Sequence, residues 1–170
     1  MFSIDTVSLS EVVQLQSISR QTFSETFSNS NSKENMDKYL NENLSIEKLS
    51  EELKNDSSHF FFIKDNERNI GYLKLNMGPS QTELKDETAL EIERIYVIQE
   101  YQGKKVGQQL YEKAIQVAKE KKAQYIWLGV WEENHKAIQF YQKNGFEVFD
   151  KHVFKLGNEE QTDLMMRLFI

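Results

Sequence analysis

The sequence predicts an α/β protein in which helices cover both faces of a mixed β-sheet. Helical periodicity dominates the first third of the chain, and a hairpin followed by alternating strand and helix patterns fills the rest. The 170 residues are 39% hydrophobic and 12% aromatic, which is enough to build a core. No stretch rich in Pro, Gly or Ser divides the chain, so we expect one domain over residues 1–170.

The first third of the chain carries helix signals. Ser8 and Glu11 have the Ser-x-x-Glu spacing of a capping box, and apolar residues then recur at helical spacing as far as Phe27. This pattern predicts a first helix. Two shorter helices are expected to follow it, one around residues 36–40 and one that opens after Ser45.

The aromatic run 60–63 and the apolar run 70–75 flank a turn signal at 66–69 and predict a β-hairpin. The pattern after it predicts, in chain order, a strand over residues 89–98, a helix over 104–122, a strand over 125–131, a helix from Asn134 to Gly145 and two strands over 146–156 and 162–170.

The strand predicted over residues 89–98 carries two acidic side chains. Because successive side chains of a strand point to opposite faces, Glu91 and Glu93 should share one face and Arg94 should lie on the other. The face of the glutamates is expected to carry Ile95 and Val97 as well.

The charge balance limits the partners. A net charge of −6 argues against nucleic acid, because proteins that bind it concentrate Lys and Arg, and it favours a cationic ligand. His59, His135 and His152 have no metal-ligand spacing, so no metal site is predicted.

The absence of cysteine excludes disulfides, thiolate metal sites and cysteine nucleophiles, and it suits a reducing compartment. No basic segment followed by an apolar stretch opens the chain, and no run approaches the ~18 apolar residues of a membrane span. We therefore expect a cytoplasmic protein that neither enters nor binds a membrane.

The clearest candidate site is the junction between the strand 89–98 and the helix 104–122. Gly103 and Gly107 lie where the loop winds into the helix, and a helix start offers free N–H groups and a positive dipole to an anion. Lys104 and Lys105 would add charge. A tight turn without a ligand explains the glycines equally well, and the ATP-type and dinucleotide glycine motifs are absent.

Two spaced motifs together resemble the GNAT superfamily of N-acetyltransferases. They are Gln-Gly-x-x-Val-Gly at 102–107 and Asn-x-x-Ala-x-x-Phe-Tyr-x-x-x-Gly-Phe at 134–146. The resemblance implies the GNAT fold, with a mostly antiparallel sheet of about seven strands. The stretches 91–97, 126–132 and 157–166 further resemble the PaiA-type spermidine/spermine N-acetyltransferases.

The resemblance implies acetyl-CoA as cofactor, with its pyrophosphate on the loop and its pantetheine arm along the strand. An N–H at Val97 would stabilise the oxyanion of a tetrahedral intermediate. The implied cofactor-binding residues are Ile95, Tyr96, Val97, Gln102, Gly103, Lys104, Lys105, Val106, Gly107, Gln108, Asn134, Ala137, Tyr141 and Lys143.

The reaction needs a base and an acid. A primary ammonium with a pKa of about 10.4 must lose a proton before its nitrogen can attack, and the leaving thiolate, with a pKa of about 8.5, must gain one. Glu91 or Glu93 is the expected base and Tyr141 the expected acid. The resemblance further implies a polyamine acceptor, which would meet Glu25, Asp37, Glu159, Glu160 and Asp163.

Several alternatives stay open. The acceptor is a polyamine or another amine, such as a protein N-terminus, a lysine side chain or an aminoglycoside, and a non-catalytic acyl-CoA sensor is the rival from another class. Lys105 occupies a position where the superfamily usually has glycine, and it would cost about 1 kcal/mol if its φ angle is positive. Superfamily members often pair through C-terminal strands, so a homodimer is possible.

Overall fold

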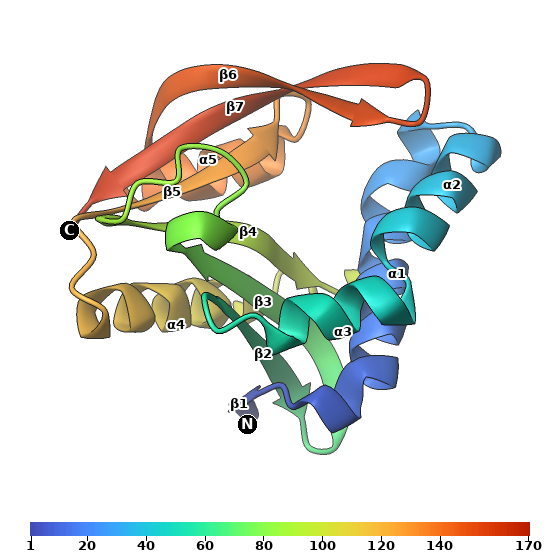
Figure 1. Cartoon of the computed structure of the whole chain (residues 1–170), viewed down its shortest axis with the longest axis horizontal. Coiled ribbons are helices and arrows are strands. Elements are labelled where there is room, and N and C mark those ends of the chain that lie inside the picture. The colour runs from blue at the N-terminus through green and yellow to red at the C-terminus, as the bar shows by residue number, and fades with distance from the viewer.

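A seven-stranded mixed sheet forms the centre of the protein (Figure 1). The structure is a computed structural model that describes residues 1–170. The strands are β1 (Phe2–Thr6), β2 (Ser58–Asp65), β3 (Arg68–Met77), β4 (Ala89–Val97), β5 (Tyr125–Trp131), β6 (Glu147–Leu156) and β7 (Glu159–Phe169). Their order is β1-β2-β3-β4-β5-β7-β6, and only β4 and β5 pair in parallel. The predicted mixed, mostly antiparallel sheet is confirmed.

Helices cover both faces of this sheet, as predicted (Figure 1). They are α1 (Val12–Phe27), α2 (Lys33–Asn43), α3 (Ile46–Lys54), α4 (Val106–Glu120) and α5 (His135–Lys143). Glu52 of α3 bonds Arg94 on one face, and Leu110 of α4 packs beside Gly71 on the other. No helix is long and apolar enough to cross a membrane.

Strand β1, at the edge of the sheet, was not predicted from the sequence. Its only inward residues are Phe2 and Ile4, too few for a hydrophobic pattern to stand out. The capping box is present, since Glu11 Oε1 accepts a hydrogen bond of 3.0 Å from the backbone N–H of Ser8. It opens a short 3₁₀ turn, and α1 begins directly after this turn.

A β-bulge in β4 overturns part of the predicted strand pattern. Lys74 of β3 pairs with Arg94 and Leu75 pairs with Ile92, so Glu93 is an extra residue that shifts the alternation by one. Arg94 therefore lies on the face of Glu91, and its guanidinium is 3.1 Å from the Glu93 carboxylate. The prediction that Arg94 opposes the glutamates was wrong.

The same bulge moves the residues that follow it. Tyr96 faces Tyr72 on the side of α1 to α3, with ring centroids 6.0 Å apart. Val97 lies on the opposite side, where its Cγ2 approaches Gly107 of α4. The prediction that Ile95 and Val97 share the face of the glutamates was therefore also wrong.

The two parallel strands separate halfway along their length. Their pairing runs from Ala89 opposite Tyr125 to Ile92 opposite Leu128 and then stops, whereas β5 stays paired with β7 as far as Trp131. Beyond Ile92, the edge of β4 that faces β5 has no partner strand. A cavity lies in this opening.

Candidate active site

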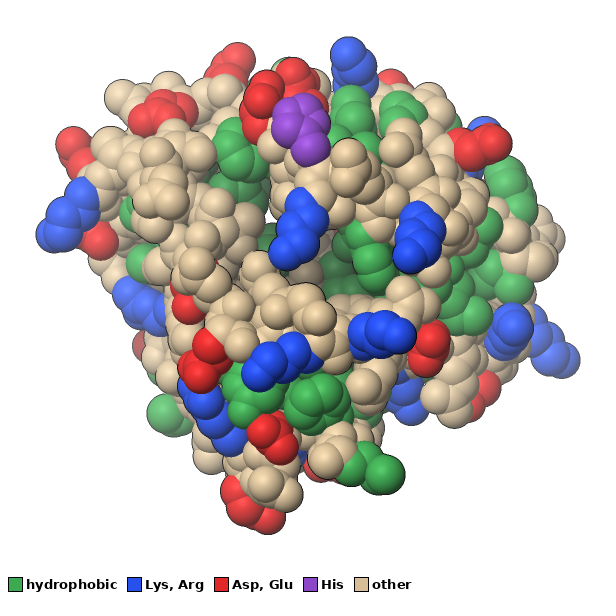
Figure 2. Space-filling model, turned by 180° about the vertical axis from the view of Figure 1, so that it is seen from behind, with side chains coloured by type: hydrophobic (Ala, Val, Ile, Leu, Met, Phe, Trp, Pro, Cys, Tyr) green, Lys and Arg blue, Asp and Glu red, His purple; other side chains and the backbone are tan.

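A cavity of about 1060 Å³ fills the opening between β4 and β5. Figure 2 shows it as a hollow in one face of the molecule, with basic side chains around its rim. The predicted site residues that line it are Glu25, Glu93, Ile95, Tyr96, Val97, Gln102, Gly103, Lys105, Val106, Gly107, Gln108, Asn134, Ala137, Tyr141, Lys143 and Asp163. Those outside the lining are Asp37, Glu91, Lys104, Glu159 and Glu160.

One end of the cavity, the cofactor end, is formed by the start of α4 and by α5. The backbone N–H groups of residues 103–108 donate no hydrogen bond to the protein, so a row of free donors meets the positive end of the α4 dipole. The side chains of Lys105, Lys136 and Lys143 line the same end. These donors and charges fit the pyrophosphate of a CoA-type molecule.

Lys105 adopts the left-handed conformation, with a φ angle of 63°. The condition for the energetic cost expected from the sequence, a positive φ angle, is therefore met. A side chain in this region costs about 1 to 2 kcal/mol relative to glycine. Its neighbour Lys104 differs from the prediction, because its Nζ lies over the Tyr101 ring, 5.0 Å from the centroid. Lys104 can therefore offer a ligand its backbone N–H but not its side-chain ammonium group.

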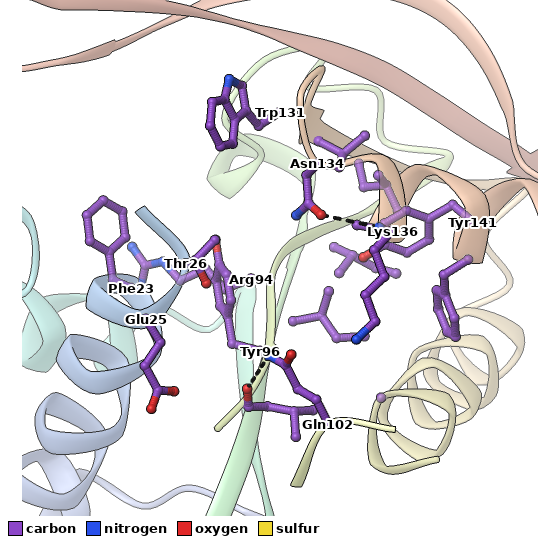
Figure 3. Close-up of a pocket in the computed structure, with 18 of the residues that line it drawn as sticks. Phe23, Glu25, Thr26, Arg94, Tyr96, Gln102, Trp131, Asn134, Lys136 and Tyr141 are labelled. Carbon is purple, nitrogen blue, oxygen red and sulfur yellow. Dashed lines mark hydrogen bonds between the residues drawn. The ribbon is translucent and has the colours of Figure 1, made fainter. Parts of the chain in front are cut away.

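Two residues of the second motif shape the wall made by α5 (Figure 3). The side chain of Asn134 caps the helix by accepting a hydrogen bond from the N–H of Ala137 at 3.3 Å. Tyr141 is 6% exposed, and its hydroxyl makes no hydrogen bond with the protein. Burial raises the pKa of Tyr141, so it carries its proton at neutral pH and can donate it.

Glu93 belongs to a largely buried ion network in the cavity wall. Its carboxylate receives Lys74 Nζ at 2.7 Å and Arg94 at 3.1 Å, and Glu52 bonds both of these cations. Burial alone would raise the pKa of Glu93, but the charges of Arg94 and Lys74 outweigh it and lower the pKa to about 2. Glu93 is therefore a weak proton acceptor.

Glu91 lies on the same face as Glu93, as predicted, since Asn76 Nδ2 donates to both carboxylates at 3.0 and 2.7 Å. Glu91 is only 3% exposed and does not line the cavity. It also accepts bonds from the Thr82 backbone at 2.8 Å and from the Thr82 hydroxyl. Burial raises the pKa of Glu91, yet Thr82 and Asn76 occupy its oxygens.

The other end of the cavity, the acceptor end, is aromatic and acidic. Phe23 of α1 stacks on Tyr39 of α2 with ring centroids 4.1 Å apart, and three further rings line the wall. These rings are Phe27, Trp131 and Phe154. Trp131 was predicted as the last residue of a strand. The only signal that it belongs to a site was its place in the segment 126–132, which resembles PaiA-type enzymes.

The five predicted acceptor carboxylates divide into two that line the cavity and three that do not, and one of the three, Glu160, pairs with Lys155 at 3.8 Å. Glu25 and Asp163 line the cavity, and Glu25 Oε1 also accepts the backbone N–H of Gln99 at 2.9 Å. Asp37 instead pairs with Lys33 on the exposed side of α2, and Glu159 accepts the Asn35 side chain at 3.0 Å. The structure therefore places Asp37 and Glu159 outside the site.

Residues 14–146 of the sequence match the acetyltransferase (GNAT) family. The match covers well over half of the chain, and the chain therefore belongs to this family. It is an N-acetyltransferase that uses acetyl-CoA, as the resemblance of the two motifs at 102–107 and 134–146 predicted.

Several known proteins resemble this chain along its length. An uncharacterized N-acetyltransferase of Lactobacillus delbrueckii subsp. lactis is 40% identical over 161 residues, or 95% of this chain and 93% of the relative. The spermidine N(1)-acetyltransferase of Thermoplasma acidophilum is 28% identical over 148 residues, or 85% and 87%. The crystal structure of the PaiA N-acetyltransferase from Thermoplasma acidophilum in complex with coenzyme A has a TM-score of 0.82 at 25% identity, covering 100% and 99%.

The fold alone does not distinguish the acceptor. The ribosomal-protein-S18-alanine N-acetyltransferase from Escherichia coli shares the fold with a TM-score of 0.71 at 16% identity, covering 100% of this chain and 94% of its own. The acceptor must be argued from the side chains of the cavity.

Proposed function

We propose that this enzyme transfers the acetyl group of acetyl-CoA to a primary amine of a polyamine such as spermidine or spermine. The observation that carries the proposal is the polarity of the cavity. Its cofactor end holds free N–H groups and lysines that suit phosphates, and its acceptor end holds aromatic rings and carboxylates that suit ammonium groups. A relative named a spermidine acetyltransferase supports the same acceptor class.

Acetyl-CoA supplies an activated acetyl thioester, and the protein supplies its orientation. The free N–H groups of residues 103–108 hold the diphosphate, and the unpaired edge of β4 at Ile95 to Val97 holds the pantetheine arm. A backbone N–H at Val97 stabilises the oxyanion of the tetrahedral intermediate. Tyr141 donates its hydroxyl proton to the leaving sulfur, which suits its raised pKa and its place in the lining.

The amine also needs a base, for which the sequence predicted Glu91 or Glu93. Glu93 is paired with Lys74 and Arg94, which suits a structural role in holding these side chains in the cavity wall. Glu91 does not line the cavity. A cavity carboxylate with free oxygens suits the role of base better.

The test is release of CoA from acetyl-CoA by the purified protein, with the product mass confirmed. The amines are spermidine, spermine, putrescine, lysine-containing and free N-terminal peptides, and an aminoglycoside. We expect turnover on the polyamines. Turnover confined to a peptide or the aminoglycoside would assign another amine, and CoA binding without turnover on any amine would make the protein an acyl-CoA sensor.

A further inference from the structure

Asp163 of β7 lies at the point where β4 and β5 separate. It is the cross-strand partner of Trp131 in β5, and its Oδ2 lies 3.4 Å from the position that a Cβ of Gly129 would occupy. Gly129 is the first residue of β5 beyond the last pair with β4, and it is exposed. The carboxylate therefore overhangs the opening beside the unpaired edge of β4, where the acetyl group must be presented.

The carboxylate of Asp163 has no partner in the protein. It forms no ion pair or hydrogen bond, although it is half-buried against aromatic side chains. The neighbouring His152 does not serve as a partner, because its Nδ1 pairs with Glu83 at 2.8 Å. A partly buried carboxylate without a cation is unfavourable. The arrangement is relieved when a cationic ligand enters the cavity.

We propose that Asp163 receives the ammonium of the acceptor and acts as the general base of the reaction. The inference rests on the proposed function and goes beyond it by replacing the glutamates of β4. One N–H bond of the ammonium breaks, and its proton moves to the Asp163 carboxylate directly or through water. The freed nitrogen lone pair forms the C–N bond, the C–S bond breaks, and the sulfur takes a proton from Tyr141. The second proton that the nitrogen loses as the amide forms restores the Tyr141 hydroxyl, and Asp163 releases the first to solvent.

The basicity of the cavity carboxylates supports this assignment. Burial raises the pKa of Asp163 to about 6, whereas that of Glu93 is about 2. Asp163 is therefore the stronger base of the two. The titratable groups that face Asp163 are His152 of β6, Glu83 of the segment before β4, and Tyr39 of α2. His152 lowers the pKa and Glu83 raises it.

The experiment compares the wild type with Asp163→Asn and with Asp150→Asn, a matched change at an exposed position of the adjacent strand β6. We expect Asp163→Asn to lower kcat on spermidine by about 100-fold or more, because a positioned base contributes about 10²- to 10⁴-fold. CoA affinity and the unfolding transition should show that the variant is folded. Asp150→Asn should match the wild type.

The pH profile separates a base from a charge that only binds. In the wild type, kcat should fall as acid protonates Asp163, and this limb should be absent in Asp163→Asn and restored in Asp163→Glu. A kcat of Asp163→Asn within about threefold of the wild type, or a raised KM with unchanged kcat, would overturn the proposal. A wild type that binds CoA but acetylates no amine overturns the proposed function first, and the base assignment falls with it.

Discussion

The two ends of the cavity are built in different ways. The cofactor end comes from two short stretches, the loop into α4 and helix α5, and its lysines are free of carboxylate partners. The acceptor end gathers side chains from α1, α2, β4, β5, β6 and β7, and several of its charges are buried. Changes at the acceptor end should therefore cost folding or chemistry, whereas changes at the cofactor end should cost little stability.

The largest expected effect is on the ion network of the acceptor end. Lys74→Met leaves Glu52 and Glu93 to share Arg94 and should lower the free energy of unfolding by about 3 to 5 kcal/mol, because it removes one partner of a buried charge. Urea unfolding measures the change. Lys119→Met on the exposed side of α4 is the control, and a loss below about 1 kcal/mol for Lys74→Met would contradict the prediction.

The next effect falls on the wall between the two ends. Tyr141→Phe removes the hydroxyl that faces the cavity and should lower kcat by about 100-fold, which corresponds to about 3 kcal/mol in the transition state. Affinity for CoA, measured by calorimetry, should stay within about twofold. Unchanged turnover would remove Tyr141 from the mechanism.

A smaller effect concerns stability and pH at the acceptor end. The pKa of Asp163 is raised in the fold from 3.8 to about 6, so the folded state binds more protons between these values and its stability falls as the pH rises through them. At pH 8 the free energy of unfolding of Asp163→Asn should therefore exceed that of the wild type by about 1 to 2 kcal/mol, after allowance for solvent screening. The variant should accordingly unfold at a higher urea concentration. Equal stability of the two proteins at pH 8 would show that the carboxylate is solvated.

The smallest effect is expected at the cofactor end. Lys105→Gly removes a left-handed side chain and should raise the free energy of unfolding by up to about 1 kcal/mol, after the entropy gained by the unfolded chain. CoA affinity should fall a fewfold with the lost charge. Lys104→Gly is the matched control, since residue 104 has no positive φ, and it should not stabilise the protein.

The same contrast explains what the sequence could predict. The cofactor end was predicted because Gly103 and Gly107 stand beside a strongly periodic helix, so a local pattern already describes the site. The acceptor end was not predicted as a whole, because rings such as Phe23 and Phe154 look like core residues in hydropathy. Only their convergence across distant segments, which a local pattern does not record, turns them into a wall.

The errors in the fold have equally physical causes. Strand β1 has only two apolar residues that pack against the core, Phe2 and Ile4, and two residues are too few to give a recognisable strand pattern. The alternation rule that misplaced Arg94 and Val97 assumes a regular strand, whereas Glu93 forms a bulge. Asp163 was predicted only as one of several carboxylates that contact the acceptor. Its lack of an ion-pair partner depends on the tertiary structure and could not be predicted from the sequence.

The bulge at Glu93 also changes what an insertion or deletion means in this strand. Removing that one residue would restore strict alternation and turn Arg94 and Tyr96 toward α4, where the apolar side chains of Ile95 and Val97 now lie. A guanidinium would then enter an apolar layer, and the acceptor end would lose two of its lining groups. A relative that lacks one residue in this strand should therefore present to the acceptor end the side chains that here face α4.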